Sequence, residues 1–215
     1  LHSLRRRQRQ MCIRDRKKAT ISGQILLNGA DVTTLSDKDW RQMRGMSTSM
    51  IFQNPSAYLN PARTVENHFK DLLRAHDESY DVNRVLHMLQ LVHLTEGERI
   101  LQSYPFQLSG GMQQRLAIAL SLILKPDIVF ADEPTSALDM LVQSSVLDLL
   151  KEVTQALGAT VILVTHNIKA AARIADRIGV MNKGHLVEMG ATEEVMAHPK
   201  DDYTRILLDS VMKVV

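Results

Sequence analysis

The stretch Leu108–Arg115 constrains the fold of this chain more than any other, because it is a turn of small residues that opens directly into an apolar helix. Such a turn directs the backbone N–H groups of Ser109, Gly110 and Gly111 toward one point in front of the helix. The positive end of the helix dipole lies at the same point and favours an anion there. This part of the sequence therefore predicts an anion site at a helix N-terminus.

A second chemical element follows this helix. A short apolar strand, expected at 128–131, ends in two neighbouring carboxylates, Asp132 and Glu133. Carboxylates suit a metal ion and a general base, so the two elements together suggest a nucleotide-hydrolysing protein. The phosphate-cradling loop of such a protein follows the pattern G-x-x-x-x-G-K-[ST]. The 215 residues contain no Gly-Lys dipeptide, so this loop is missing from the sequence.

The composition is that of an ordinary globular protein, with 45% apolar and 23% charged residues. The longest apolar stretch, Leu116–Leu124, is too short to span a bilayer, and we see no secretory signal. Cys12 is the only cysteine, so the chain can form no internal disulfide or cysteine metal site.

The positive charge is concentrated at the N-terminus. Residues 1–18 hold eight of the 26 Lys and Arg residues and one of the 24 acidic residues, so the rest of the chain is mildly acidic. The sequence pI of 8.7 is therefore no evidence for nucleic-acid binding. We interpret residues 1–18 as a foreign or disordered tail and leave them out of the fold prediction; a disordered basic arm that binds a partner or a membrane is the alternative.

Strand and helix patterns alternate along the body. An Asn-Gly turn after Gln24–Leu27 predicts a hairpin, Ser49–Phe52 reads as a buried strand, and the apolar spacing of Val82, Val85, Leu86 and Leu89 is helical. The segment 55–125 is expected to be mainly helical, and its last helix ends at Lys125-Pro126 because proline cannot continue it.

The second half of the chain predicts a parallel sheet. A helix at 140–157 ends before Gly158, and the β-branched run Thr160–Thr165 suits a parallel strand covered on both faces. A helix at about 167–175 and a hairpin at 178–189 follow. The fold class is therefore α/β, with a parallel sheet and a helical insertion.

Polar side chains follow three of the predicted strands, namely Gln53, the pair Asp132 and Glu133, and His166. The carboxyl ends of parallel strands share one edge of a sheet, where ligands bind. Mg²⁺ takes oxygen ligands, which Asp132 and Gln53 can supply. Glu133 can polarise an attacking water, and His166 can donate a hydrogen bond to a terminal phosphate.

These motifs resemble those of ATP-binding cassette (ABC) ATPases over about residues 20–210. The similar segments are, in order, the Q-loop glutamine Gln53, the signature Leu108–Gln113, Walker B with its catalytic glutamate at Ile128–Glu133, the D-loop Ser136–Asp139 and the switch histidine His166.

The resemblance implies a P-loop NTPase-like core, here incomplete, with an α-helical ABC subdomain that binds ATP and Mg²⁺. In that family two cassettes dimerise head to tail. Ser109, Gly110 and Gly111, with Gln113 in the same signature, would then contact the ATP of the partner. Gln53, Asp132, Glu133 and His166 would serve this subunit's own ATP, and Asp139 would communicate between the two sites.

The resemblance also implies a division of the chain. It comprises the tail 1–18, a partial β-subdomain and core to the Q-loop (19–54), a helical subdomain with the signature (55–125), a core with Walker B, D-loop and switch histidine (126–190) and a C-terminal extension (191–215).

Shorter motifs are similar to the oligopeptide, dipeptide and nickel importer branch. They are Ser103–Gln107, Ile51–Pro55 with Leu59–Pro61, and the C-terminal His198-Pro199 and Tyr203–Leu208. Asn167 and Asp202 depart from the branch pattern but remove no catalytic group. The implied partners are a second ABC ATPase, two transmembrane permeases and, indirectly, a solute-binding protein, with no nucleic acid. The implied location is the cytoplasmic face of a bacterial or archaeal membrane.

Three interpretations follow. The first is the ATPase subunit of a peptide or nickel importer, represented by an N-terminally truncated sequence without Walker A, which by itself is inactive. The second is a non-catalytic partner that presents its signature to another cassette. The third is a soluble ABC ATPase outside transport, a class that usually has tandem cassettes or a coiled-coil insertion, neither of which is visible here.

Overall fold

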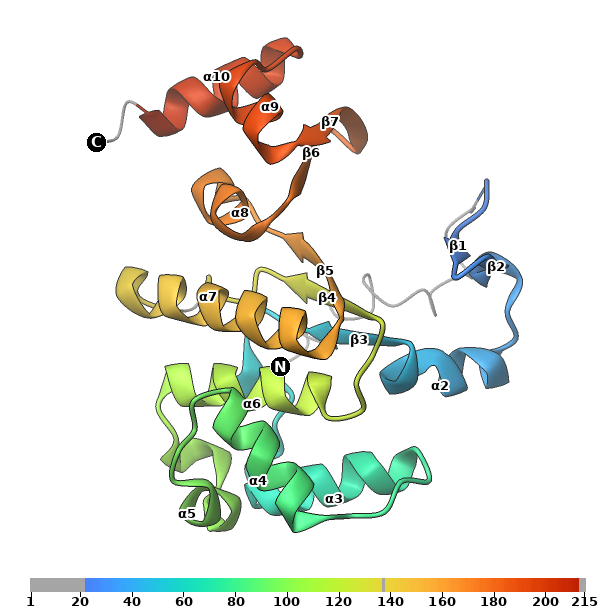
Figure 1. Cartoon of the computed structure of the whole chain (residues 1–215), viewed down its shortest axis with the longest axis vertical. Helices are drawn as coiled ribbons and strands as arrows, with labels where there is room; N and C mark the ends of the chain where they lie inside the picture. Colours follow the sequence, from blue (N-terminus) through green and yellow to red (C-terminus); the bar gives the residue numbers. More distant parts are fainter. Residues whose placement is uncertain (1–21, 137, 213–215) are drawn as a thin grey trace. The chain divides into compact units, whose positions relative to one another are not determined.

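The computed structural model describes residues 22–136 and 138–212 (Figure 1), so the basic tail 1–18 lies outside the described residues. Contacts between Cα atoms divide the chain into two compact units, one ending at Arg41 and the other beginning at Gln42. The division into five segments expected from the sequence stays a prediction.

The first unit contains the predicted hairpin. Strand β1 (Leu26–Leu27) pairs antiparallel with β2 (Ala30–Asp31). Asn28 and Gly29 both have positive φ angles, 48° and 81°, as a two-residue turn between twisted strands requires. Asp31 then caps the short 3₁₀ helix η2 (Val32–Thr34) by accepting a hydrogen bond from Thr33 N. The hairpin is therefore confirmed.

The second unit is built on a three-stranded parallel sheet. Its strands are β3 (Thr48–Ile51), β4 (Ile128–Asp132) and β5 (Thr160–Val164), in the order β3-β4-β5. Ile51 lies opposite Ala131, and Asp132 lies opposite Val164. The carboxyl ends of all three strands therefore meet at one edge. The predicted α/β class with a parallel sheet and a helical insertion is confirmed.

One face of this sheet is buried. Ile51, Val129 and Ala131 belong to the main core, where α6 (Gly110–Leu122) contacts β3 and α7 (Met140–Leu157) contacts β5. Both predicted helices form, and α7 ends at Gly158 in the left-handed conformation, with φ of 71°, where a residue without Cβ is favoured.

The other face of the sheet carries exposed apolar side chains. Phe130 and Ile162 are neighbours across the sheet, 38% and 43% exposed, and Val164 is 54% exposed. The prediction that β5 is covered on both faces is therefore wrong for the described residues. The β-branched run did produce a strand, but its inside-outside alternation reflects burial on one face only.

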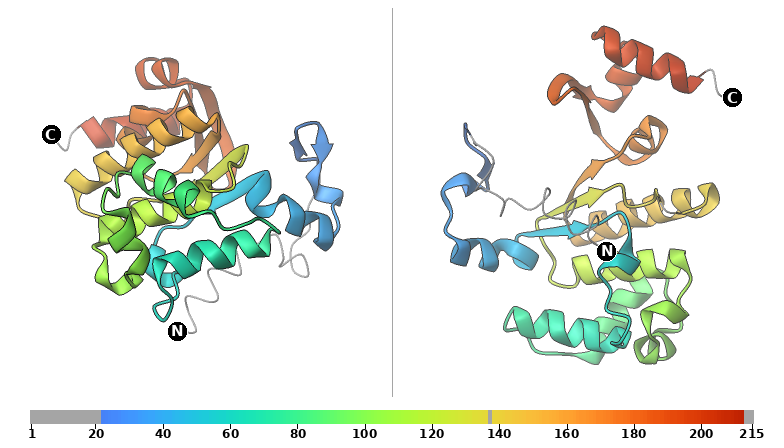
Figure 2. Two further views of the ribbon diagram at one scale, coloured as in Figure 1. Left: turned by 60° about the horizontal axis from the view of Figure 1, so that its bottom comes forward. Right: turned by 180° about the vertical axis from the view of Figure 1, so that it is seen from behind.

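The segment between β3 and β4 is mainly helical. Helices α3, α4 and α5 contact one another or α6 around a core of Phe69, Leu73, Leu89 and Ile100. Figures 1 and 2 show α6 between this group and the sheet with α7. The elements are η3 (Pro55–Ala57), α3 (Val65–Ala75), α4 (Val82–Leu91), α5 (Gly97–Gln102) and η4 (Pro105–Gln107). Val82 begins α4 and is 41% exposed, so it does not share the buried face of Val85 and Leu89.

The C-terminal part forms a smaller core. The predicted hairpin is confirmed as β6 (Arg177–Asn182) and β7 (His185–Ala191), paired antiparallel. Ile178, Val180 and Val195 are its buried centre, with alanines of α8 packed against them. The helices here are α8 (Ile168–Ile174), α9 (Thr192–Ala197) and α10 (Asp202–Met212). Among the described helices, none combines the length and the apolar character needed to cross a membrane.

Gly45 lies at a kink near the end of α2 (Asp37–Met46), shortly before β3, at a point of close packing. Its φ is +85°, and a Cβ there would lie 2.6 Å from His76 Nε2 and 2.9 Å from Leu124 Cδ1. We expect Gly45→Ala to lower the free energy of unfolding by about 2 kcal/mol, because backbone strain and crowding add. The control is Gly158→Ala, where φ is also positive but no atom lies within 4 Å; it should cost about 1 kcal/mol. Equal losses in denaturant unfolding would refute the crowding.

Candidate active site

The three parallel strands deliver the predicted polar residues to one edge of the sheet. Gln53 lies two residues beyond the end of β3, Asp132 is the last residue of β4 with Glu133 next to it, and His166 lies two residues beyond β5. The strand order β3-β4-β5 makes these three strands neighbours, and neighbouring strands run about 5 Å apart. Asp132 lies on the same face of the sheet as Phe130 and Val164, because it pairs with Val164.

Glu133 has an unusual backbone. Its φ is +44°, in the left-handed region that side-chain-bearing residues seldom occupy. Its N–H donates to the carbonyl of Val164, the last residue of β5, at 2.8 Å. Ser136 donates to the Glu133 carbonyl from its backbone N–H and its hydroxyl, at 3.3 and 3.1 Å. These bonds hold Glu133 at the end of the β4–β5 pair in a strained conformation, which is a frequent feature of functional sites.

Glu133 and His166 are in direct contact. His166 Nδ1 lies 2.7 Å from Glu133 Oε1, and because a carboxylate accepts, the histidine donates from Nδ1. The Glu133 side chain is 27% exposed, whereas that of His166 is 76% exposed. The pair therefore presents a carboxylate oriented by an imidazole whose far edge faces solvent.

The carboxyl group of Asp132 is partly shielded from solvent. Burial raises the pKa of its carboxyl above the usual value, and the neighbouring charge of Glu133 raises it further. Burial disfavours the ionised form of Asp132, and the charge of Glu133 disfavours a second negative charge beside it. A bound cation would reverse them, because it stabilises the ionised form.

The oxygen donors of Asp132 and Gln53 fit a magnesium ion whose remaining ligands come from elsewhere. Mg²⁺ is usually held by one or two carboxylates plus substrate phosphates and waters, and Asp132 and Gln53 come from adjacent strands at one edge. Among the described residues, no group of three or more His, Cys, Asp or Glu side chains could hold a metal ion by itself. At this edge, phosphate or water oxygens would complete the ligand set.

The small-residue turn forms a capped helix N-terminus. Ser109 Oγ accepts a hydrogen bond from Met112 N at 3.3 Å and begins α6, which is the N-cap arrangement. A Cβ on Gly110 would lie 3.6 Å from Leu138, and one on Gly111 would lie 3.1 Å from Val142. The turn is therefore packed closely against the start of α7, and glycine fits this close approach.

Asp139 begins α7 in the same way. Its Oδ1 accepts from Val142 N at 3.0 Å, and Gln143 donates to the Leu138 carbonyl. Since Val142 and Leu138 also face the glycines of the signature, the N-termini of α6 and α7 lie side by side. Two neighbouring helix N-termini can favour an anion at this place.

Gln113 is engaged within its own chain. Its Nε2 donates to the carbonyls of Pro105 and Leu108, at 2.9 and 3.1 Å. The preceding turn is closed by a hydrogen bond from Tyr104 N to Gln107 Oε1. Gln113 therefore fastens the turn before Ser109 to α6, and its two amide hydrogens are used there.

The predicted residues thus form two groups. Glu133 contacts His166, and Gly110 and Gly111 pack on the segment around Asp139, but within the described residues no hydrogen bond joins the two groups. The sequence did not indicate the direct Glu133–His166 contact. Its only signal was that both residues follow apolar strands, and strand order decided that these strands are neighbours.

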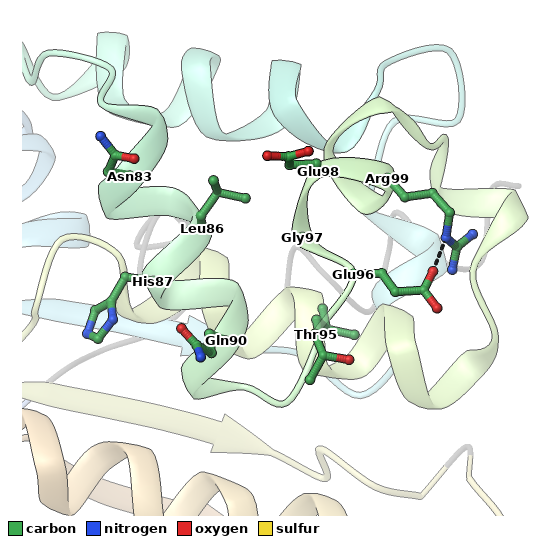
Figure 3. A pocket seen from close by; sticks show the side chains of 10 residues that line it. Asn83, Leu86, His87, Gln90, Thr95, Glu96, Gly97, Glu98 and Arg99 are labelled. Carbon is green, nitrogen blue, oxygen red and sulfur yellow. Dashed lines mark hydrogen bonds and ion pairs between the residues drawn. The ribbon is translucent and has the colours of Figure 1, made fainter.

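One pocket lies away from these residues. A pocket of about 580 Å³ opens between α4 and α5 and is lined by residues 83–99, among them His87, Glu98 and Arg99 (Figure 3). Arg99 pairs with Glu96 at its rim. None of the residues predicted to contact nucleotide lines it, so this pocket is not the candidate site.

The sequence is similar to a known protein family and to named relatives. The sequence profile of the ABC transporter family covers residues 11–136. The chain is 42% identical over 195 residues to the dipeptide transport ATP-binding protein DppD of Bacillus subtilis, covering 89% of this chain and 58% of the relative. It is 38% identical over 203 residues to the oligopeptide transport ATP-binding protein OppD of Lactococcus lactis, covering 93% and 60%. The chain thus spans less than two thirds of the length of these relatives.

A solved structure is similar in fold and in sequence. An ATP-binding cassette determined as a dimer in a post-hydrolysis state, bound to ADP and Pi, superposes with a TM-score of 0.67. It is 31% identical and covers 80% of this chain and 74% of its own.

The strain at Glu133 can be tested by a pair of substitutions. Both Glu133→Gly and Glu133→Ala remove the contact with His166, but only glycine adopts φ of +44° without strain. We expect the glycine variant to be more stable than the alanine variant by about 1 kcal/mol. Denaturant unfolding of both variants measures the difference. An alanine variant as stable as the glycine variant would show that the backbone at this position is relaxed.

Proposed function

The chain belongs to the ABC transporter family of ATP-binding cassettes, and we propose that it is the ATP-binding and ATP-hydrolysing subunit of a peptide importer. The observation that carries the proposal is the Glu133–His166 pair at the end of β4, next to Asp132. The names of the relatives described above favour peptides over nickel, the other solute of this branch.

In the proposed reaction Glu133 is the general base. One of its oxygens accepts from His166 Nδ1, which leaves the other to accept a proton from the attacking water. When both ring nitrogens carry a proton, His166 can also donate from Nε2 to the terminal phosphate. Asp132 and Gln53 would hold Mg²⁺, which would supply neutralisation of the phosphate charge. The raised pKa of Asp132 fits this role, because a carboxylate placed beside another gains from a bound cation.

We propose that the signature acts on the nucleotide of a second cassette. Ser109, Gly110 and Gly111 begin α6 beside the N-terminus of α7, and such a double N-terminus suits the terminal phosphate of ATP. The dimeric form of the similar cassette supports this arrangement. Asp139 caps α7 at the same place. Binding or loss of the phosphate there would therefore act on the D-loop, whose Ser136 donates to the Glu133 carbonyl. Gln113 then positions the signature turn rather than the phosphate.

The site also needs a phosphate-binding loop that the 215 residues do not contain. We propose that a further strand pairs with β5 and that a further helix covers Phe130, Ile162 and Val164. Two observations support this: β5 is paired on one side only among the described residues, and these apolar side chains are exposed. Parallel sheets are normally covered on both faces.

The proposed assembly contains two cassettes and two transmembrane permeases at the cytoplasmic face of the membrane, supplied by a solute-binding protein. The helical segment 55–108 would receive the membrane subunit. A second candidate is a non-catalytic cassette that only presents its signature; the missing Gly-Lys dipeptide favours it. The oriented Glu133–His166 pair argues for catalysis, because a module that only presents its signature has no need of it.

One prediction of the proposed function concerns the 215-residue chain. We expect negligible ATP binding, because backbone amides and a lysine that cradle the β- and γ-phosphates are absent from the sequence. Equilibrium titration with a fluorescent ATP analogue measures this. Micromolar affinity would contradict the proposed need for a further loop.

Another prediction of the proposed function concerns a cassette completed with the upstream residues of its own gene. We expect Glu133→Gln to bind ATP normally and to lower turnover by about 10²- to 10⁴-fold, the usual contribution of a general base. The control is Glu152→Gln on α7, an exposed glutamate whose ion pair with His93 is long, at 3.9 Å. Turnover near that of the control would exclude Glu133 as the base and support the non-catalytic alternative.

A further inference from the structure

The loop that follows Gln53 is attached to α3 by a histidine. After η3, Leu59 is buried at 4% exposure, and Asn60 N lies 2.9 Å from Nε2 of His68 on the first turns of α3. The other ring nitrogen of His68, Nδ1, lies 2.8 Å from the carbonyl of Thr64, one helical turn earlier. The ring thus bridges the loop and the helix.

These two contacts determine the charge and the tautomer of His68. A backbone N–H only donates, so Nε2 must accept from Asn60. A backbone carbonyl only accepts, so Nδ1 must donate to Thr64. Both bonds exist together only when the imidazole is neutral and carries its proton on Nδ1.

A second contact attaches the same loop to the same helix. Arg63 makes a two-pronged ion pair with Asp71, with nitrogen–oxygen distances of 2.5 to 3.1 Å. Both side chains are more than 40% exposed, and exposed pairs of this kind contribute little. The contact through His68 involves the backbone of the loop, so it fixes the path of the chain more directly.

Packing carries this attachment back to Gln53. Asn60 follows buried Leu59, and the ring of Tyr58, just before it, lies 5.4 Å from the ring of Phe52. Phe52 is the residue that separates Gln53 from the end of β3. The loop between Phe52 and Asn60 is therefore held at both ends, by the sheet and by His68.

We propose that His68 is a positioning residue: through its Nδ1–H tautomer it fixes the loop of residues 54–63 to α3 and thereby sets the position of Gln53. A displacement of α3 then moves the loop and the Gln53 amide with it. The role rests on the proposed function of Gln53 as a ligand at the nucleotide site.

Two substitutions separate the two nitrogens. His68→Gln places an amide oxygen near the position of Nε2 and can still accept from Asn60. His68→Asn reaches only the position of Nδ1, so it keeps a donor to Thr64 and loses the bond to the loop. Each variant keeps the contact of one ring nitrogen and loses the other, so each is the control for the other contact.

The experiment is nuclear magnetic resonance on the ¹⁵N-labelled 215-residue chain at neutral pH. We expect the ring nitrogens of His68 to show the Nδ1–H tautomer. We expect the Asn60 amide to exchange with solvent about fivefold faster in His68→Asn, the size of effect that one hydrogen bond gives, and to stay near wild type in His68→Gln. The side-chain amide signal of Gln53 should shift in His68→Asn alone.

Three outcomes would overturn the proposal. They are an Nε2–H tautomer, equal exchange of Asn60 in all three proteins, and a faster Asn60 exchange that leaves the Gln53 amide signal unmoved. None of these measurements involves ATP. A failure here is therefore distinct from a failure of the proposed function, which the turnover of Glu133→Gln tests.

Discussion

The parallel pairing of β3, β4 and β5 is the constraint on which the rest of the site depends. Their register sets Ile51 beside Ala131 and Asp132 beside Val164, so the residues that follow each strand arrive at one edge. The bond from Glu133 N to the Val164 carbonyl extends this pairing by one residue. It holds Glu133 in a strained turn, and it brings the carboxylate within reach of His166.

The pairing is stabilised from one side only within the described chain. Core residues on α6 and α7 cover Val129 and Ala131, and the same two helices start side by side where Gly111 approaches Val142. The helices that bury the sheet are therefore also the ones that present their N-termini. The opposite face keeps Ile162 and Val164 in solvent, which is why β5, predicted as fully covered, alternates between half-buried and exposed residues.

Local features were predicted well because their causes are local. The turn at Asn28-Gly29 and the left-handed end of α7 at Gly158 each depend on backbone preferences within a few residues. The contacts of His68 were not predictable in this way. Thr64 lies one helical turn before His68, but Asn60 lies in the preceding loop, and only the folded path of that loop brings its N–H to Nε2 of the same ring.

The sequence by itself determined the family, the order of the motifs and the residue types at the strand ends, because these depend on residue identity and spacing. Only the tertiary structure decided which groups meet. Strand order made neighbours of Glu133 and His166, helix packing placed the signature glycines against the start of α7, and the turn before Ser109 took both amide hydrogens of Gln113. Hydrogen bonds and packing act over a few ångströms, so they follow from the position of the chain in space and not from its order.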